Sequence, residues 1–285
     1  MERRAYGNTG EMISVVAFAG IVVRDESSYD SRKYVSWAID HDVNYFDVAP
    51  AYGNAQDKLG PALKPYRDSV FLACKTNKRD ALSAREELEN SLKLMQTDSF
   101  DLYQLHSMTT RNDLETVTGS GGALETLIRA REEGLVRHLG FSAHSSEIAV
   151  ELMDLFTFDS ILYPVNFTTW FESDFGPAIS EQASTHGVTQ LALKGAAYQA
   201  LQNPGKRTRS KCWYEPIIDK ELMSLALRWT LSQNIASAIP SGDPQLWQMA
   251  VEIAEDYTPI DHDEEKRLMK VAKGKKPLFT LKRTA

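Results

Sequence analysis

Short apolar runs alternate with amphipathic stretches along almost the whole chain. The apolar runs predict eight buried strands, at residues 15–20, 44–49, 70–75, 100–106, 136–142, 160–166, 188–194 and 235–240. The runs are continuously apolar, which is typical of parallel strands that are covered on both faces. Between them, apolar residues recur at the spacing of a helix, as at Val35, Ala38 and Ile39. The pattern therefore predicts strands and helices in alternation.

The helix boundaries carry fewer signals than the strands. Ser83 is followed by Glu86 three residues later, which forms a capping box and predicts that a helix opens at Ser83. Gly134 predicts the end of a helix over 123–133. The spacing predicts further helices over 29–41, 147–156, 219–232 and 244–255, one that ends near 186–187, and a charged helical tail from 261.

The repeat of eight strands and helices, with no shift in composition, favours one α/β domain over residues 1–285, built as a (β/α)8 TIM barrel. A doubly wound open sheet is the runner-up fold. That fold would need a glycine-rich turn directly after the first strand, but the residues after Gly20 are IVVRDESS. The sequence therefore predicts the barrel, with two domains as the weaker option.

Composition narrows the partner and the compartment. The 285 residues include 32 Lys+Arg and 39 Asp+Glu, which gives a net charge of −7. Phosphate binding needs a cationic surface, so this balance argues against nucleic acid as the main partner. The uncharged run over 12–23 follows Arg3 and Arg4 as in a secretion signal, but it is too short to span a bilayer, which takes about 20 residues. We expect a cytoplasmic protein with no membrane partner.

The cysteines and histidines do not predict a metal site. Cys74 and Cys212 are too few for a disulfide framework or a thiolate metal centre, and we expect two reduced thiols. A single bridge between them is the alternative. His138, His144 and His186 lack the spacing of metal ligands. We therefore expect no bound metal.

Titratable side chains fall at the expected carboxyl ends of neighbouring strands. Asp47 ends the second strand and Tyr52 lies in the turn after it, while Lys75 and His106 end the third and fourth strands. Active sites of (β/α)8 barrels lie at this end. Each residue alone has an ordinary explanation, as a cap, a packing aromatic, an exposed lysine or a rim histidine. Their occurrence on adjacent strands favours a shared site.

Such a quartet has a coherent chemistry. A tyrosine hydroxyl, with a reference pKa of about 10, is a weak acid at neutral pH, and a nearby ammonium lowers that pKa. A carboxylate would hold the ammonium in place, and an imidazole could orient a carbonyl group. A positioned proton donor of this kind contributes about 10²–10⁴ in rate. Carbonyl reduction also needs a hydride, which no side chain supplies, so a nicotinamide cofactor is implied.

Three segments carry a family resemblance. They are NYFDVAPAYGNAQDKLG (44–60), LENSLKLMQTDSFDLYQLH (88–106) and GGALETLIRAREEGLVRHLGFSAH (121–144). All three closely resemble aldo-keto reductases, and the opening segment 3–20 is similar to the N-terminal hairpin and first strand of that family. The resemblance implies a TIM barrel with an N-terminal β-hairpin and a C-terminal helical tail. It also implies reduction of aldehydes and ketones with NADPH, or less often NADH.

The resemblance assigns roles to the quartet. The catalytic tetrad of the family is Asp, Tyr, Lys and His, which matches Asp47, Tyr52, Lys75 and His106. Tyr52 is then the general acid, Lys75 and Asp47 tune it, and His106 orients the substrate. The expected substrate is a small-molecule carbonyl compound.

The cofactor side departs from the family pattern. Where the family has Ser and Asn after the fifth strand, this chain has Ser142 and Ala143. The usual Gln of the sixth strand is replaced by Leu162, and the stacking aromatic of the seventh by Leu193. Asn166 and Lys194 are polar residues close to these replaced positions. The expected cofactor-binding residues are Gly20, Ser142, Asn166, Lys194, Ser241 and Gly242.

The phosphate end of the cofactor also departs. The family has basic residues after its eighth strand, whereas this chain has AIPSGDPQLWQMA, in which Ser241 and Gly242 open a helix N-terminus that suits a phosphate through its free N–H groups. The irregular loop over 195–214 contains the basic run KRTRSK (206–211) and could supply the missing charge if it folds over the cofactor. A solvated loop is an equal alternative. We expect NADPH, with NADH as the second option.

Two functions are compatible with these features. The first is a carbonyl reductase that also catalyses the reverse alcohol oxidation. The second is a non-catalytic module that senses the nicotinamide redox state and docks on a partner protein, as the potassium-channel beta subunits of this superfamily do. The intact tetrad favours the enzyme, while the reduced set of cofactor contacts keeps the second function open.

Overall fold

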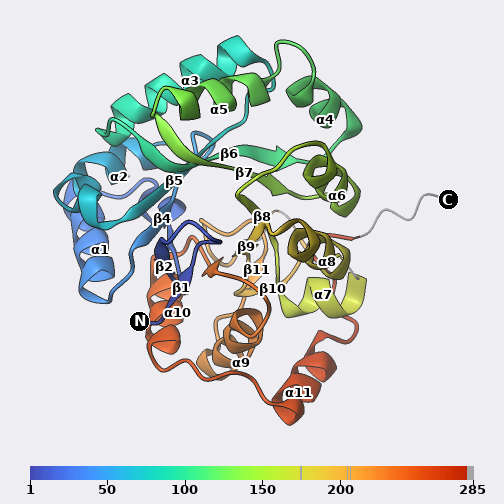
Figure 1. Ribbon diagram of the computed structural model, residues 1–285. Helices are drawn as coiled ribbons and strands as arrows, with labels where there is room; N and C mark the ends of the chain where they lie inside the picture. Colours follow the sequence, from blue (N-terminus) through green and yellow to red (C-terminus); the bar gives the residue numbers. More distant parts are fainter. Residues whose placement is uncertain (174, 204, 206, 281–285) are drawn as a thin grey trace.

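The computed structural model describes residues 1–173, 175–203, 205 and 207–280. In this part of the chain, eight parallel strands form one sheet in the order β3, β4, β5, β6, β7, β8, β9, β12. Their bounds are Phe18–Ala19 (β3), Tyr45–Asp47 (β4), Phe71–Thr76 (β5), Phe100–Met108 (β6), Val136–Ala143 (β7), Ser160–Pro164 (β8), Thr189–Leu193 (β9) and Ser237–Ile239 (β12). The sheet lies at the centre of the molecule, with helices around it (Figure 1).

Backbone hydrogen bonds join the two ends of this sheet. Val16 forms a parallel bridge with Ala238, the Ala17 N–H donates to the Ala238 carbonyl (2.9 Å), and the Ala238 N–H donates to the Val15 carbonyl (2.8 Å). These bonds bring the first and last strands together, which an open doubly wound sheet does not do. The predicted (β/α)8 barrel is confirmed.

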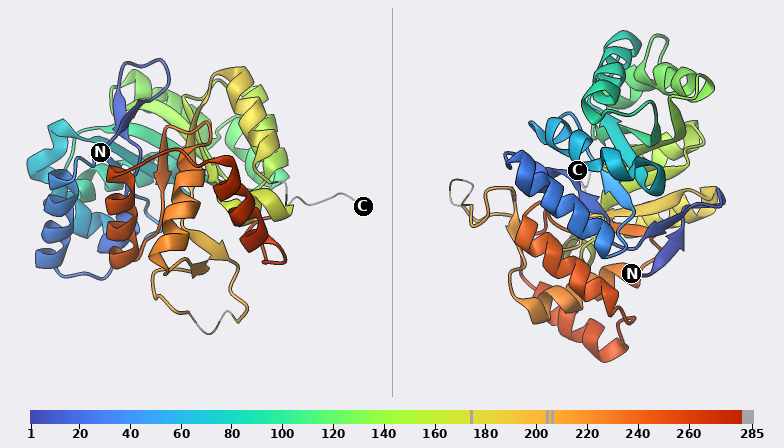
Figure 2. Two further views of the ribbon diagram at one scale, coloured as in Figure 1. Left: turned by 90° about the horizontal axis from the view of Figure 1, so that it is seen from below. Right: turned by 90° about the vertical axis from the view of Figure 1, so that its left-hand side faces the viewer.

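A helix follows each strand of the barrel and covers its outer face (Figures 1 and 2). These helices are Ser28–Asp40 (α1), Ala55–Leu63 (α2), Ala81–Met95 (α3), Ala123–Glu132 (α5), Ser146–Leu155 (α6), Pro177–His186 (α8), Lys220–Leu231 (α9) and Pro244–Glu255 (α10). One cluster of buried apolar side chains extends from Tyr6 to Ala272. The assignment of 1–285 as a single domain stays a prediction.

Further elements surround the barrel. The strands Arg3–Ala5 (β1) and Met12–Ser14 (β2) form the antiparallel N-terminal hairpin that the resemblance implied. The tail begins with the helix His262–Ala272 (α11), as the sequence predicts. Elements that the sequence analysis missed are Arg111–Thr118 (α4), Phe167–Ser173 (α7), Ala197–Gln199 (β10), Glu215–Pro216 (β11) and two 3₁₀ turns, Gly20–Val23 and Lys64–Ser69.

The predicted start of α3 at Ser83 is wrong. The helix begins at Ala81, because the carboxylate of Asp80 accepts a hydrogen bond from the Ser83 N–H and so acts as the N-cap (2.8 Å). The capping box that does occur opens α4, where Thr110 and Asp113 bond to each other's backbone N–H groups.

Three other features bear on function. Cys74 and Cys212 are free and buried. Within the described residues, no group of three or more His, Cys, Asp or Glu side chains is arranged to hold a metal ion. In the same part of the chain, every helix is too short or too polar to cross a membrane.

Candidate active site

The barrel brings the four predicted catalytic residues to one end of adjacent strands. Asp47 is the last residue of β4, Lys75 lies near the end of β5, and His106 lies near the end of β6. Tyr52 lies in the turn between β4 and α2. Parallel strands end at the same rim, so residues far apart in sequence become neighbours.

A buried ion pair joins two members of this tetrad. The Lys75 ammonium donates a hydrogen bond to Oδ1 of Asp47 and a second, of 3.3 Å, to the carbonyl of Val48. Both side chains are only 1% exposed. The other carboxylate oxygen, Oδ2 of Asp47, accepts from Nε2 of Gln104 (3.2 Å) and from the hydroxyl of Tyr45 (3.5 Å). Each oxygen of the buried carboxylate therefore has a donor.

Gln104 and Tyr45 were missed by the sequence analysis. Tyr45 precedes Asp47 by two residues and Gln104 precedes His106 by two residues. Side chains two apart on a strand point to the same face, so each shares a face with a residue of the tetrad. This spacing is the signal that could have identified them.

Tyr52 lies beside the ammonium and the imidazole. Nζ of Lys75 is 5.3 Å from the centroid of the Tyr52 ring, and the His106 ring lies edge-on to that ring at 6.0 Å and 85°. Burial raises the pKa of Tyr52, and the charge of Lys75 lowers it by less, so the pKa stays above its ordinary value. The predicted effect of the ammonium is present but outweighed, because the barrel desolvates the phenol as well. The hydroxyl is therefore protonated at neutral pH.

Of the two remaining groups, the Lys75 ammonium is charged and the His106 imidazole is neutral. Burial is the largest single influence on the pKa of Lys75 and lowers it, but Asp47, Tyr52 and Cys74 together raise this pKa by more, so Lys75 stays charged. Burial lowers the pKa of His106 to about 2, and the positive charge of Lys75 acts in the same direction, so the imidazole is neutral. Nδ1 of His106 is buried without a hydrogen-bond partner among the described residues. This atom can accept or donate a hydrogen bond to a ligand, according to the tautomer.

A cavity of about 340 Å³ opens beside the tetrad. Asp47, Tyr52, Lys194, Ser241 and Gly242 line it, which brings five of the predicted site residues together. Its lining also includes three cations that the list of site residues did not contain, Arg24, Arg207 and Lys211. Asp47, the one carboxylate among the lining residues described, is already paired with Lys75. Lys211 is paired with Glu26, and Arg24 with Asp25. Lys194 and Arg207 are lining cations that have no carboxylate partner among the described residues, and they suit an anionic ligand.

The remaining predicted cofactor residues are not part of this lining, as far as the described residues define it. Oγ of Ser142 accepts a hydrogen bond from the Ser107 N–H (2.8 Å). Oδ1 of Asn166 accepts from the N–H of Thr169 (3.0 Å), while its Nδ2 is buried without a partner in the described part of the chain.

Gly20 packs directly against the rim of the barrel. A Cβ atom at Gly20 would lie 2.7 Å from the Asp47 carbonyl and 2.9 Å from a methyl group of Val48. Only a glycine permits this approach, because real Cβ contacts are almost never so short. Gly20 thus lets the 3₁₀ turn after β3 come close to the backbone that carries Asp47.

Lys194 is the member of the cofactor-side set with the most unusual environment. Burial lowers the pKa of Lys194 to about 8. Its ammonium lies 5.4 Å from the ring centroid of Trp213 and 5.3 Å from that of Tyr214. These contacts fix the cation over two aromatic rings at the edge of the cavity.

The N-terminus of α10 differs from the expectation of free N–H groups after Ser241 and Gly242. The N-cap is Asp243, whose carboxylate accepts from the N–H groups of Gln245 and Leu246 (both 3.2 Å). The Asp243 N–H itself donates to Oγ of Ser241 (3.2 Å). These three groups are already bonded within the chain, so a phosphate there would have to displace the cap.

The basic loop forms hydrogen bonds and ion pairs with two other segments, the one after β3 and the start of α10. Lys211 donates to the carbonyl of Val22 (2.6 Å) and pairs with Glu26 (2.5 Å). Arg209 donates to Gln245 (3.0 Å) and lies 3.7 Å from the Asp243 carboxylate. Lys206, which belonged to the predicted basic run, lies outside the described residues. Residues of the loop therefore line the cavity, and Arg209 offsets the charge of Asp243.

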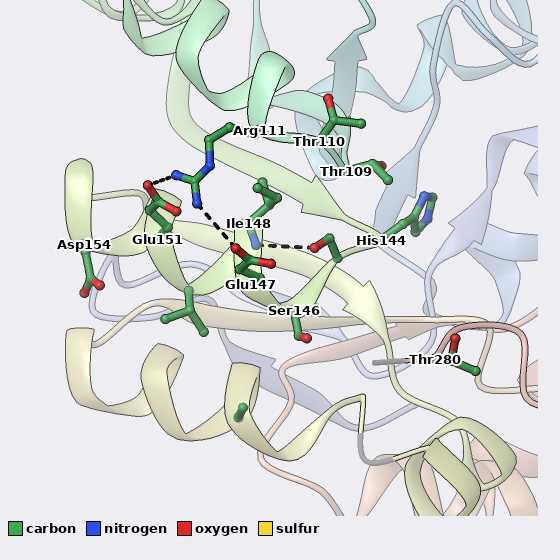
Figure 3. Close-up of a pocket in the computed structure, with 13 residues that line it drawn as sticks. Thr109, Thr110, Arg111, His144, Ser146, Glu147, Ile148, Glu151, Asp154 and Thr280 are labelled. Carbon is green, nitrogen blue, oxygen red and sulfur yellow. Dashed lines mark hydrogen bonds and ion pairs between the residues drawn. The ribbon is translucent and has the colours of Figure 1, made fainter. Parts of the chain in front are cut away.

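A larger cavity of about 740 Å³ is lined by the loops after β6 and β7, by α6, and by single residues of α8 and the C-terminal segment (Figure 3). Arg111 pairs with Glu147 and Glu151 on one side of it, as Figure 3 shows. His144 lines this cavity and stacks on the ring of Phe279, with the centroids 4.7 Å apart. Phe279 also contacts Trp213, which lines the smaller cavity, so this one ring touches a lining residue of each cavity.

Comparison with known proteins identifies the family of this chain. The model of the aldo/keto reductase family matches residues 23–216. Aldo-keto reductase YhdN of Bacillus subtilis (strain 168) is 34% identical over 231 residues, which is 73% of this chain and 65% of YhdN. The methylglyoxal reductase DkgA of Yersinia pestis is 30% identical over 124 residues, which is 42% of this chain and 43% of DkgA. The chain thus spans less than two thirds of the length of these two relatives.

The fold has a close counterpart among solved structures. The holo form of aldo-keto reductase AKR11C1 from Bacillus halodurans superposes with a TM-score of 0.73 at 21% identity, over 97% of this chain and 98% of that chain. The chain therefore has the fold of that aldo-keto reductase. The chain belongs to the aldo/keto reductase family.

The buried pair of Lys75 and Asp47 gives a first prediction. Lys75→Met leaves the Asp47 carboxylate buried with one oxygen unpaired, and loss of one partner of a buried pair costs about 3 kcal/mol or more. The free energy of unfolding in urea should fall by about this amount, while the double variant Asp47→Asn/Lys75→Met should recover most of it. Lys93→Met, at an exposed position in α3, should change the free energy by less than about 0.5 kcal/mol. A single variant as stable as the double variant would contradict the buried pair.

Proposed function

We propose that this protein is an NAD(P)H-dependent carbonyl reductase that converts aldehydes and ketones to alcohols and also catalyses the reverse oxidation. The observation that carries the proposal is the placement of Tyr52 at the rim cavity, with the Lys75 ammonium 5.3 Å and the His106 ring 6.0 Å from its own ring centroid. A proton donor, a charged group that stabilises its conjugate base and a neutral hydrogen-bonding ring are the groups that carbonyl reduction needs.

The residues present fit a nicotinamide dinucleotide. The cavity beside Tyr52 is lined by Lys194 and Arg207, which have no carboxylate partner among the described residues and complement a pyrophosphate. The buried Nδ2 of Asn166, which has no partner among the described residues, is a free donor close to the rim. When bound, the reduced nicotinamide supplies the hydride.

In the proposed reaction, Tyr52 acts as the general acid. The carbonyl carbon accepts a hydride with its electron pair, the π electrons of the C=O bond move to oxygen, and that oxygen takes the hydroxyl proton of Tyr52. The charged Lys75 stabilises the phenolate that remains, and Asp47 holds Lys75 in place. The neutral imidazole of His106 orients the carbonyl oxygen through a hydrogen bond. A proton from solvent restores the Tyr52 hydroxyl.

We infer that NADPH is preferred to NADH. The 2′-phosphate distinguishes the two cofactors by about two negative charges. Arg207 and Arg24 line the cavity, and Arg209 offsets the charge of Asp243 at the start of α10. The basic loop would then bind the 2′-phosphate, which basic residues after the eighth strand bind elsewhere in the family.

Tyr52→Phe tests the general acid. Removal of the proton donor should lower the turnover of benzaldehyde by about 10² or more, because a positioned acid contributes about 10²–10⁴. The Kd of NADPH, measured through the quenching of tryptophan fluorescence, should be unchanged. Tyr29→Phe, at a residue that is 70% exposed, is the matched control and should keep full turnover. Retention of turnover in Tyr52→Phe would exclude Tyr52 as the acid.

NADPH binding by the natural chain without turnover of benzaldehyde or methylglyoxal would favour the redox-sensing module instead.

Arg207→Ala tests the cofactor preference. Loss of a charge-assisted bond to phosphate costs about 1.5–3 kcal/mol, so the Kd of NADPH should rise by about tenfold or more while that of NADH stays within about twofold. The two dissociation constants can be measured by fluorescence titration. Arg129→Ala, at a side chain that is 68% exposed in α5, should change neither constant. An equal rise in both constants would place Arg207 away from the 2′-phosphate.

The pKa of Lys194 makes cofactor affinity depend on pH. Burial lowers this pKa to about 8, so the ammonium is present below that pH and is lost above it. An anionic ligand favours the charged form and raises the pKa, so the Kd of NADPH should increase as the pH rises from about 8 to about 10. Lys194→Met should bind NADPH more weakly at neutral pH and should show a flat profile over this range. A natural chain with the same flat profile would exclude Lys194 from the cofactor site.

A further inference from the structure

β6 is irregular at the residue that carries the imidazole. The register between β6 and β7 shifts between Leu105 and Met108, so the strand bulges at His106 and Ser107. Ser107 has a φ of 54°, in the left-handed region. A residue with a side chain adopts this region only where its surroundings enforce it, and such residues gather at functional sites.

Side chains from neighbouring elements hold this bulge. The Ser107 N–H donates to Oγ of Ser142 in β7 (2.8 Å). Nη2 of Arg79 donates to the carbonyl of His106 (2.9 Å) and to that of Ser107 (3.3 Å). Arg79 is therefore the side chain, among the described residues, that bonds to the backbone of His106 itself.

Arg79 is held on its other side. Its Nε donates to Oδ1 of Asp113 (2.8 Å), and both side chains are about 20% exposed. Asp113 is fixed in turn, because it forms the capping box of α4 with Thr110. The backbone carbonyl of Arg79 accepts from the Ala123 N–H at the start of α5 (2.8 Å). The guanidinium thus links the loop after β5, the bulge of β6 and the first turn of α4.

The imidazole depends on this backbone for its direction. Nδ1 of His106 has no hydrogen-bond partner among the described residues, so no side-chain bond at that atom fixes the ring. The ring nevertheless lies edge-on to Tyr52. The direction in which the side chain leaves the bulge therefore decides where the ring nitrogens point.

We propose that Arg79 is a positioning residue for His106, which sets the direction of the imidazole and thereby the face of a ketone that receives the hydride. This inference rests on the proposed function, since it takes His106 as the group that orients the carbonyl. Neither the motifs of the sequence nor the family resemblance assigned a role to Arg79.

The test compares Arg79→Gln and Arg79→Lys with the natural chain in the reduction of acetophenone with NADPH. Arg79→Gln should lower the enantiomeric ratio of the alcohol by about threefold or more and raise KM by about tenfold, because small misplacements of a reacting group cost up to about 10²-fold. Arg79→Lys keeps the charge, but its donors lie on a single nitrogen and cannot span Asp113 and both carbonyls, so its ratio should be intermediate. A role in stability alone would not change the ratio of the two enantiomers.

Arg85→Gln is the matched control. Arg85 also donates to two partners, Glu89 and Glu133 (both 2.6 Å), but it lies on α3 and not at the bulge. Its loss should leave both KM and the enantiomeric ratio unchanged. An equal loss of selectivity in Arg85→Gln and Arg79→Gln would overturn the proposal, as would a folded Arg79→Gln or Arg79→Lys with the ratio of the natural chain.

A crystal structure of Arg79→Gln separates this inference from the proposed function. The expected change is a Ser107 φ outside the left-handed region and a turned His106 ring. If the natural chain reduces no carbonyl compound, the proposed function fails, and the structure of the variant still shows whether Arg79 positions the ring. An unchanged bulge and ring in that structure would refute the positioning role.

Discussion

The active end of this barrel depends on one buried pair of charges, the Lys75 ammonium and the Asp47 carboxylate. Removal of two ions from water is costly, and the attraction between them offsets that cost only when their other hydrogen-bonding atoms also have partners. Gln104, Tyr45 and the carbonyl of Val48 supply these partners. The barrel can therefore hold a permanent positive charge beneath its rim, beside the phenol that would use it.

The same burial sets the protonation states of the other two groups. Desolvation disfavours whichever form of a group is charged, so the pKa of the Tyr52 phenol rises and that of the His106 imidazole falls to about 2. One environment thus keeps a weak acid protonated and a base neutral at the same pH. This separation of pKa values is the usual way in which a site assigns its acid and its hydrogen-bonding partner.

The positive charge around the cavity comes from the loop after β9 and from Arg24, and not from the start of α10. The N–H groups of Gln245 and Leu246 at the start of α10 are bonded to Asp243, which removes them as anion ligands. Lys211 joins the loop after β9 to Glu26, in the segment between β3 and α1. The loop therefore lines the cavity and places cations in its wall.

The sequence by itself determined the barrel and the placement of Asp47, Tyr52, Lys75 and His106 at neighbouring strand ends, because both follow from local periodicity and the order of parallel strands. Only the tertiary structure decided which groups complete the site. The contact of Gln104 with Asp47, the reach of Arg79 to the bulge at His106 and the position of the basic loop join segments that are distant in sequence. Side-chain direction and burial, which fix these contacts and the balance of pKa values, arise only when the barrel closes.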